Sequence, residues 1–247
     1  MAVRRAITFD VDWAPDTAIA RCAEICVAAG VPATFFATHP SAVVRELQAD
    51  SRFEVGIHPN FLPGSSQGGS VVQIIDYCLD LVPDARSMRT HGLVQSSHLL
   101  NEIIDHAPQI QNDVSLFLYR HPGLRPVEWF SPQGNRLIRM PYFWEDDLAA
   151  ARPDWSWDGV PEAMPETGLQ IFNFHPIHVA LNLRSADSYE GLKRSLKGKP
   201  LWQATNQEIT AFASTKPGVA HFLEGLLADC KNFATISSLV ATNEPCS

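Results

Sequence analysis

Residues 6–12 read Ala-Ile-Thr-Phe-Asp-Val-Asp, an apolar run that ends in two carboxylates. The run is typical of a buried β-strand, so Asp10 and Asp12 are expected where this strand opens into its loop. Side chains alternate along a strand, and the two carboxylates should therefore point to one side while Val11 points away. Two like charges held close raise each other's pKa unless a cation or a hydrogen-bond network neutralises them. The pair thus implies either a bound metal or a shared proton.

The composition is that of a globular chain with an ample core. Of 247 residues, 45% are hydrophobic and 19% charged, and 27 acidic residues outnumber 19 basic ones that are scattered along the sequence. This balance argues against nucleic acid and anionic membranes as partners and favours a small molecule or a glycan. Residues 1–5 lead into the first strand without the apolar stretch of a signal peptide, and no segment is apolar enough to cross a membrane. We expect a cytoplasmic protein without membrane insertion.

Strand-like and helix-like segments alternate along the chain, which predicts a parallel sheet covered by helices. The predicted strands are residues 6–9, 33–37, 53–57, 85–89, 114–118, 137–140 and 169–174. The predicted helices are residues 15–29, 42–48, 71–81, 97–106, 188–196 and 217–230. About seven β/α repeats suggest a barrel, and no domain boundary is convincing, so residues 1–247 are predicted to form one domain. The segments 59–69 and 141–164 are long enough to be functional loops.

Polar residues follow most of the predicted strands. The carboxyl ends of parallel strands meet at one rim of a β/α fold, so these side chains should gather there. They are Asp10 and Asp12, His58 and Asn60, Arg89 and His91, Glu145, Asp146 and Asp147, and His175. A single strand-end histidine or an acidic loop has an ordinary structural explanation, but the joint pattern predicts a site.

Four short motifs resemble those of the polysaccharide deacetylases with the NodB-homology fold, which belong to carbohydrate esterase family 4. They are Thr-Phe-Asp-Val-Asp at 8–12, His-Pro-Asn-Phe at 58–61, Arg-Thr-His at 89–91 and Phe-x-Phe-His at 172–175. Longer strings at 95–97, 141–147 and 175–178 resemble the WbmS-like branch, which is associated with surface-polysaccharide biosynthesis. The resemblance implies an α/β fold, a distorted (β/α)7 barrel. It also implies metal-dependent hydrolysis of an N-acyl group, acetyl or formyl, or less often an O-acyl group, on an amino sugar or glycan precursor.

The resemblance also implies roles for individual residues. Asp10 matches the catalytic base, Asp12 the carboxylate ligand of the metal, and His58 the first histidine of the metal motif. Arg89 matches the arginine that holds the base. His175 resembles the general acid, and one of Asp146 or Asp147 would orient it.

The metal motif departs from the family pattern, which places a second histidine four residues after the first. Here that position is Leu62, which cannot bind a metal. A catalytic zinc site needs about three protein ligands of N or O type and an open position. His91, Asn60 and His178 are the candidates for the third ligand, and we favour His91 because imidazole is the better donor. Zinc is the expected metal, with nickel, cobalt or manganese as alternatives and loss of metal binding as a further possibility.

Residues near the predicted rim are candidates for binding the sugar. Asn60 and His178 supply polar groups, and Tyr142 and Trp144 could offer ring faces on which a sugar stacks. Five further aromatic residues near the rim share this possibility, with core packing as the alternative explanation. They are Trp13, Phe61, Phe143, Trp155 and Trp157.

Two other functions compete with the deacylase hypothesis. Asp-x-Asp after a first strand also opens the haloacid-dehalogenase phosphohydrolases, but that hypothesis leaves His58, Arg89 and His175 unexplained. A degenerate barrel that binds a glycan or a partner without turnover is motivated by the missing second histidine.

Overall fold

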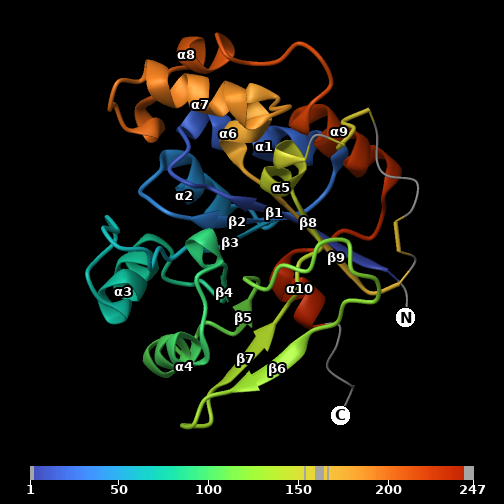
Figure 1. Cartoon of the computed structure of the whole chain (residues 1–247). Helices are drawn as coiled ribbons and strands as arrows, with labels where there is room; N and C mark the ends of the chain where they lie inside the picture. Colours follow the sequence, from blue (N-terminus) through green and yellow to red (C-terminus); the bar gives the residue numbers. More distant parts are fainter. Residues whose placement is uncertain (1–2, 153, 159–163, 166, 242–247) are drawn as a thin grey trace.

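The computed structural model describes residues 3–152, 154–158, 164–165 and 167–241. Its nine strands form one sheet in the order β6-β7-β5-β4-β3-β2-β1-β9-β8 (Figure 1). The strands are β1 (Arg4–Asp10), β2 (Ala33–Ala37), β3 (Phe53–Ile57), β4 (Ser87–Met88), β5 (Asn112–Asp113), β6 (Val127–Phe130), β7 (Arg136–Arg139), β8 (Trp144–Glu145) and β9 (Leu169–Phe174). All neighbours pair in parallel except β6 and β7, which form an antiparallel hairpin.

Helices flank the curled sheet, and α10 lies near the start of β1 (Figure 1). The helices are α1 (Asp16–Ala29), α2 (Ala42–Ala49), α3 (Val71–Leu81), η1 (His91–Leu93), α4 (Ser97–His106), α5 (Asp146–Ala151), α6 (Pro176–Leu181), α7 (Ala186–Ser195), η2 (Leu201–Gln203), α8 (Asn206–Thr210), α9 (Val219–Asp229) and α10 (Ile236–Ala241). Among the described residues, no helix has the length and apolar character needed to span a membrane.

The chain from 136 to 145 curls the sheet into a distorted barrel. Its first part, β7, runs parallel to β5, and its last part, β8, runs parallel to β9. Between them Tyr142 forms a parallel bridge to Phe117. This one segment therefore joins both sides of the parallel sheet, and the predicted α/β fold, a distorted (β/α)7 barrel, is confirmed.

Local sequence explains where the elements begin and end. Ser41, Ser70 and Ser96 precede α2, α3 and α4, and each side-chain oxygen accepts a hydrogen bond from a backbone N–H of the first turn. Gly30 ends α1 with φ of 65°, a left-handed conformation that glycine adopts without strain. The strand β2 is buried throughout, as expected for a parallel strand covered on both faces.

The structure corrects two predicted strands. The strand predicted at 114–118 is instead β5 at Asn112–Asp113, and Ser115 leaves the ladder because its backbone N–H donates to the Asp113 carboxylate. The strand predicted at 85–89 shortens to Ser87–Met88. The prediction also missed β6, β8, α5, α6, α8 and α10, all of which are six residues or shorter.

Candidate active site

Asp10 ends β1 inside the barrel, held by two donors from distant strands. The Nη1 atom of Arg89 donates to Asp10 Oδ1 at 2.9 Å, and the amide of Asn173 donates to Asp10 Oδ2 at 2.8 Å. Arg89 is fully buried, also bonds Thr8 and Asn173, and stacks on the Tyr142 ring with 4.5 Å between the guanidinium carbon and the ring centroid. The carboxylate therefore has one defined orientation.

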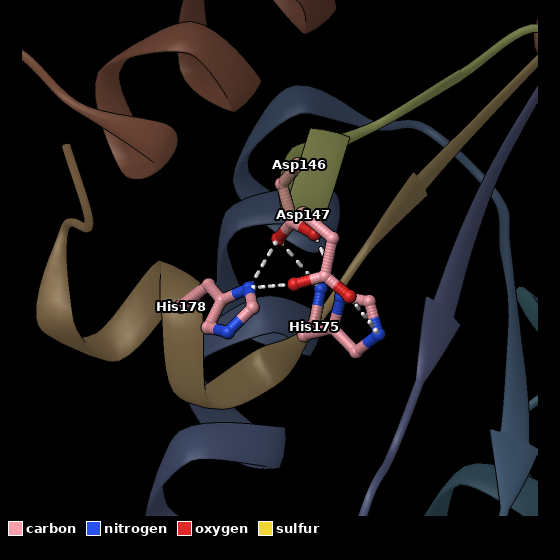
Figure 2. A group of neighbouring side chains, drawn as sticks. All are labelled: Asp146, Asp147, His175 and His178. Atoms are coloured by element: carbon pink, nitrogen blue, oxygen red, sulfur yellow. Dashed lines mark hydrogen bonds and ion pairs between the residues drawn. The ribbon is translucent and has the colours of Figure 1, made fainter. Parts of the chain in front are cut away.

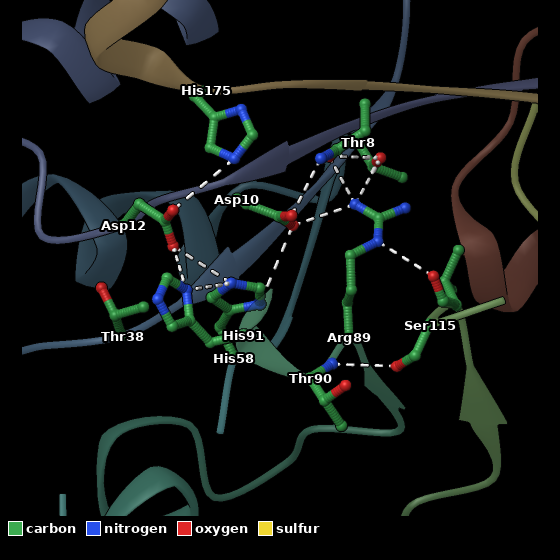
Figure 3. A network of polar contacts seen from close by, with 12 residues as sticks. Thr8, Asp10, Asp12, Thr38, His58, Arg89, Thr90, His91, Ser115 and His175 are labelled. Carbon is green, nitrogen blue, oxygen red and sulfur yellow. Dashed lines mark hydrogen bonds and ion pairs between the residues drawn. The ribbon is translucent and has the colours of Figure 1, made fainter. Parts of the chain in front are cut away.

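Asp12 lies beyond the end of β1, where the backbone turns through the left-handed region. Asp12 has φ of 45° and Trp13 has φ of 53°, so strand alternation does not place Asp12, and that part of the sequence argument is wrong. The turn instead brings Asp12 Oδ1 to 3.1 Å from His58 Nε2 and 3.0 Å from His91 Nδ1 (Figure 3). The two ring nitrogens are 3.4 Å apart.

These three residues fit a divalent metal. Asp12, His58 and His91 offer one oxygen and two nitrogens, all within 4.8 Å of one another. This donor set matches a catalytic zinc site with three protein ligands and an open position. Burial raises the pKa of Asp12, but the hydrogen bonds from His58 and His91 lower it by more than burial raises it. The net pKa of Asp12 therefore lies well below the usual value. The ionised carboxylate is the form that binds a cation.

His175 follows β9 and is fixed by Asp146. Its Nδ1 lies 2.6 Å from Asp146 Oδ1, and its backbone N–H donates to Asp146 Oδ2 at 2.8 Å (Figure 2). The Nε2 atom points the other way, 3.5 Å from Asp12 Oδ2 (Figure 3). Burial lowers the pKa of His175, but the carboxylates of Asp147 and Asp146 raise it, and the net pKa lies well above the usual value. The neighbouring carboxylates thus favour the protonated form of the ring. Its Nε2 atom is directed toward Asp12, which together with His58 and His91 forms what we call the metal-type cluster.

His178 packs on the far side of Asp146. Its Nδ1 lies 3.2 Å from Asp146 Oδ2 (Figure 2). Its ring also contacts Tyr189 edge-on, with 5.2 Å between the centroids. Burial raises the pKa of Asp146, but the charges of His175 and His178 lower it well below the usual value. Together with Asp147, the residues Asp146, His175 and His178 form a second group that could hold a cation by composition. However, Asp146 already accepts a hydrogen bond from the His175 backbone N–H, so its carboxylate holds His175 in position.

One pocket of about 270 Å³ collects most of the predicted residues. Its walls include Asp10, Asp12, His58, Thr90, His91, Gly92, Leu93, Tyr142, Glu145, Asp147 and His175. The convergence of strand ends at one rim, which the sequence predicted, is therefore found in the structure.

Three predicted substrate-binding residues lie outside this pocket. Trp144 is only 1% exposed and stacks on Phe222 of α9 at 4.6 Å, so the prediction that it offers a ring face to a sugar is wrong. Asn60 accepts the backbone N–H of Leu62 in a turn. His178 is buried against Asp146. Trp157, at 4% exposure, is also core, whereas Trp13 is half-buried and packs edge-on against His91.

Sequence reasoning missed several residues that shape the site. Asn173 is the amide that holds Asp10, and its polarity within the apolar strand β9 was an available signal. Gln67 is buried and donates to the carbonyls of Thr38 and His58, which pins the loop 59–69 beside the His58 backbone. Glu145 was noted only as part of an acidic run. Gln67 had no signal, because its partners are backbone groups, which every residue carries.

Comparison with known proteins identifies the family of the chain. The family model of the WbmS-like polysaccharide deacetylases matches residues 7–193. The chain belongs to this family. Among solved structures, the crystal structure of WbmS from Bordetella bronchiseptica, assigned as a polysaccharide deacetylase involved in O-antigen biosynthesis, is 32% identical, with a TM-score of 0.77 over 91% of this chain and 90% of that one.

A more distant similarity concerns the CE4 domain of a multidomain xylanase from the hindgut metagenome of Trinervitermes trinervoides. It is 15% identical with a TM-score of 0.47, over 98% of this chain and 90% of that one. Among curated proteins no sequence matches the chain significantly. Because the family is established, the haloacid-dehalogenase hypothesis is wrong.

Proposed function

We propose that this protein is a metal-dependent hydrolase that removes an acetyl or formyl group from the nitrogen of an amino sugar during surface-polysaccharide biosynthesis. The observation that carries the proposal is one pocket that combines three groups: the donor set of Asp12, His58 and His91, the anchored carboxylate of Asp10, and the ring of His175. Membership of the WbmS-like polysaccharide deacetylases supports the substrate class. The substrate would be an acylated amino sugar or glycan precursor.

In this proposal, Asp12, His58 and His91 hold the metal, with zinc favoured by the mixed nitrogen and oxygen donors and nickel, cobalt or manganese as alternatives. When bound, the metal supplies Lewis acidity that polarises the acyl carbonyl and lowers the pKa of water. The degenerate-barrel hypothesis rested on the missing second histidine at position 62. His91, whose Nδ1 lies 3.0 Å from Asp12 Oδ1, is the proposed replacement for that histidine and supports the catalytic alternative.

Asp10 is the proposed general base. Arg89 and Asn173 each donate to one of its oxygens, which fixes the carboxylate while leaving a lone pair on each oxygen free. The base takes one proton from water as the water oxygen bonds to the acyl carbon. Since Arg89 is fully buried and stacked on Tyr142, the orientation of Asp10 is set by the barrel interior and not by solvent.

His175 is the proposed general acid. The amide C–N bond breaks as His175 Nε2 gives its proton to the departing sugar nitrogen, leaving a free amine and acetate or formate. Asp146 holds the opposite ring nitrogen at 2.6 Å, and Asp147 lies 3.7 Å from Nε2. Both carboxylates favour the charged ring, and a positioned acid of this kind typically contributes ~10² to 10⁴-fold to the rate.

The decisive experiment is elemental analysis of purified protein after loading with Zn²⁺, Ni²⁺ or Co²⁺, followed by assay of acetate and formate release from acylated amino sugars. The wild type should hold about one metal ion, and Asp12→Ala and His91→Ala should lose it together with activity. His106→Ala is the matched control, because His106 pairs with Asp76 at 2.6 Å on the outer helices. Full metal content in His91→Ala would show that His91 is not a metal ligand. Absence of metal in the wild type would refute the proposal.

A further inference from the structure

Glu145 has no assigned role in the reaction, yet it is part of the pocket wall. It ends β8, directly before Asp146, and lines the pocket beside Asp147 and His175. Its Oε2 accepts the hydroxyl of Tyr142 at 2.5 Å, and this tyrosine also lines the pocket. Glu145 therefore presents a carboxyl group to whatever occupies the space next to the proposed general acid.

Each of the other pocket carboxylates faces a cationic or imidazole partner. Asp10 pairs with Arg89, Asp12 lies against His58 and His91, and Asp147 lies 3.7 Å from His175. For Glu145, in contrast, no lysine, arginine or histidine of the described residues lies within ion-pair distance. The pocket lining as a whole contains no lysine or arginine.

Burial disfavours the charged form of the Glu145 carboxyl group. Burial raises the pKa of Glu145 to about 7, although the hydrogen bond from Tyr142 and the charge of His175 oppose the shift. Above this pKa the group is ionised, and a partly desolvated carboxylate without a cation at ion-pair distance repels a second anion more strongly than a solvated surface group does.

We propose that Glu145 determines the charge of the sugar that this pocket accepts. Uncharged sugars and sugars carrying an amino group bind, whereas phosphorylated or carboxylated sugars are rejected. This inference rests on the proposed function, because it concerns the sugar that the same pocket would bind. The neutral amide substrate and the ammonium product of N-deacylation carry no negative charge, so Glu145 repels neither of them. A unit charge ~5 Å from the carboxylate would change affinity by about tenfold.

The test compares ligand binding in the wild type, Glu145→Gln and Glu24→Gln. The last is a matched control that removes the same charge from the exposed face of α1. The probes are glucosamine, N-acetylglucosamine and N-acetylglucosamine 6-phosphate, whose Kd values are measured by titration calorimetry or ligand-detected NMR. Metal-loaded and metal-free protein are both used, so that ligation of the phosphate by the metal is separated from repulsion by Glu145.

Above pH 7, where Glu145 is ionised, the phosphorylated sugar should bind to the wild type about tenfold more weakly than the neutral one. Glu145→Gln should narrow this ratio five- to tenfold and weaken glucosamine by a similar factor, while Glu24→Gln changes neither. An unchanged ratio in Glu145→Gln, equal affinities in the wild type, or no sugar binding at millimolar concentration would each overturn the inference. If acetate is released from neutral sugars but the ratio is unchanged, the proposed function stands and only the role of Glu145 fails.

Discussion

The two ends of the barrel each gather polar groups around a carboxylate, but with different partners. At the amino ends of the strands, Glu54 accepts hydrogen bonds from the hydroxyls of Thr34, Ser87 and Ser237 and from the Ser237 backbone N–H, at 3.2, 2.5, 2.6 and 2.9 Å. At the carboxyl ends, Asp12 faces the ring nitrogens of histidines. Neutral donors satisfy the first carboxylate completely, whereas the second lies among ring nitrogens that could hold a cation together with it.

The contrast matches the division of labour in β/α barrels, where one end carries stability and the other chemistry. The Glu54 network ties four strands to α10, because Thr34, Glu54, Ser87 and Asn112 lie near the starts of β2, β3, β4 and β5. It also satisfies the first backbone N–H groups of α10, which a helix cannot satisfy itself.

The largest expected effect comes from Asp12→Asn, which changes one carboxylate oxygen to an amide. An amide is a far weaker ligand, so metal content should fall below about a tenth of the wild-type value and turnover by at least ~10²-fold. Stability of the metal-free protein should change by less than about 1 kcal/mol, since asparagine tolerates the left-handed backbone at position 12. Elemental analysis, kinetics and denaturant melts measure the three quantities. Full metal content in this variant would show that Asp12 is not a ligand.

Glu54→Gln makes the same chemical change at the other end, with the opposite expected result. The amide group cannot accept the hydrogen bonds that one carboxylate oxygen now accepts, so unfolding free energy should fall by about 1–3 kcal/mol. Metal content and kcat should stay near wild type at temperatures where the variant is folded. If Glu54→Gln lost metal while melting normally, the two ends would not be independent.

Glu145→Gln tests how the free energy of unfolding depends on pH through a carboxyl group at the carboxyl end of the barrel. The pKa of Glu145 rises from the ordinary 4.5 to about 7 on folding, mainly through burial. Between these values the unfolded chain releases the proton and the folded protein keeps it, so this group lowers stability as pH rises and the loss is complete above pH 7. The glutamine variant lacks this penalty. It should be more stable than wild type at pH 8, by on the order of 2 kcal/mol, and equal to it near pH 4. Thermal melts at the two pH values measure this, and a pH-independent difference would contradict it.

The sequence was sufficient to predict the convergence of the metal-type cluster, because strand ends of a β/α fold necessarily meet at one rim. The aromatic prediction failed for a reason that the sequence also contains. Trp144 and Glu145 are neighbours on one strand, so they point to opposite faces; Glu145 lines the pocket and Trp144 packs outward on α9. Partners such as Asn173 and Gln67 depend on strand register and loop path, and two-residue strands such as β4 and β8 carry no periodic signal.

The smallest expected effect concerns Gln67, which connects the loop 59–69 to the carboxyl end of the barrel, where His58 lies. Its side chain bonds the carbonyls of Thr38 and His58 and accepts the backbone N–H of Asn60 at 2.6 Å. Gln67→Ala frees the backbone around His58 without removing a ligand. Metal affinity should fall by about tenfold, as is usual for groups that hold ligands in place, with a stability loss of about 1 kcal/mol.

Gln73→Ala is the matched control, because Gln73 bonds the backbone N–H of Gly69 at the far end of the same segment. It should leave metal affinity unchanged, as measured by competition with a chromogenic chelator. Equal losses in both variants would mean that general loosening of the loop, and not the position of the His58 backbone, controls the metal. A loss of metal affinity confined to Gln67→Ala would show that the buried amide of Gln67 contributes to the site although it binds no metal. The reason would be that the orientation of His58 depends on the loop that this amide holds.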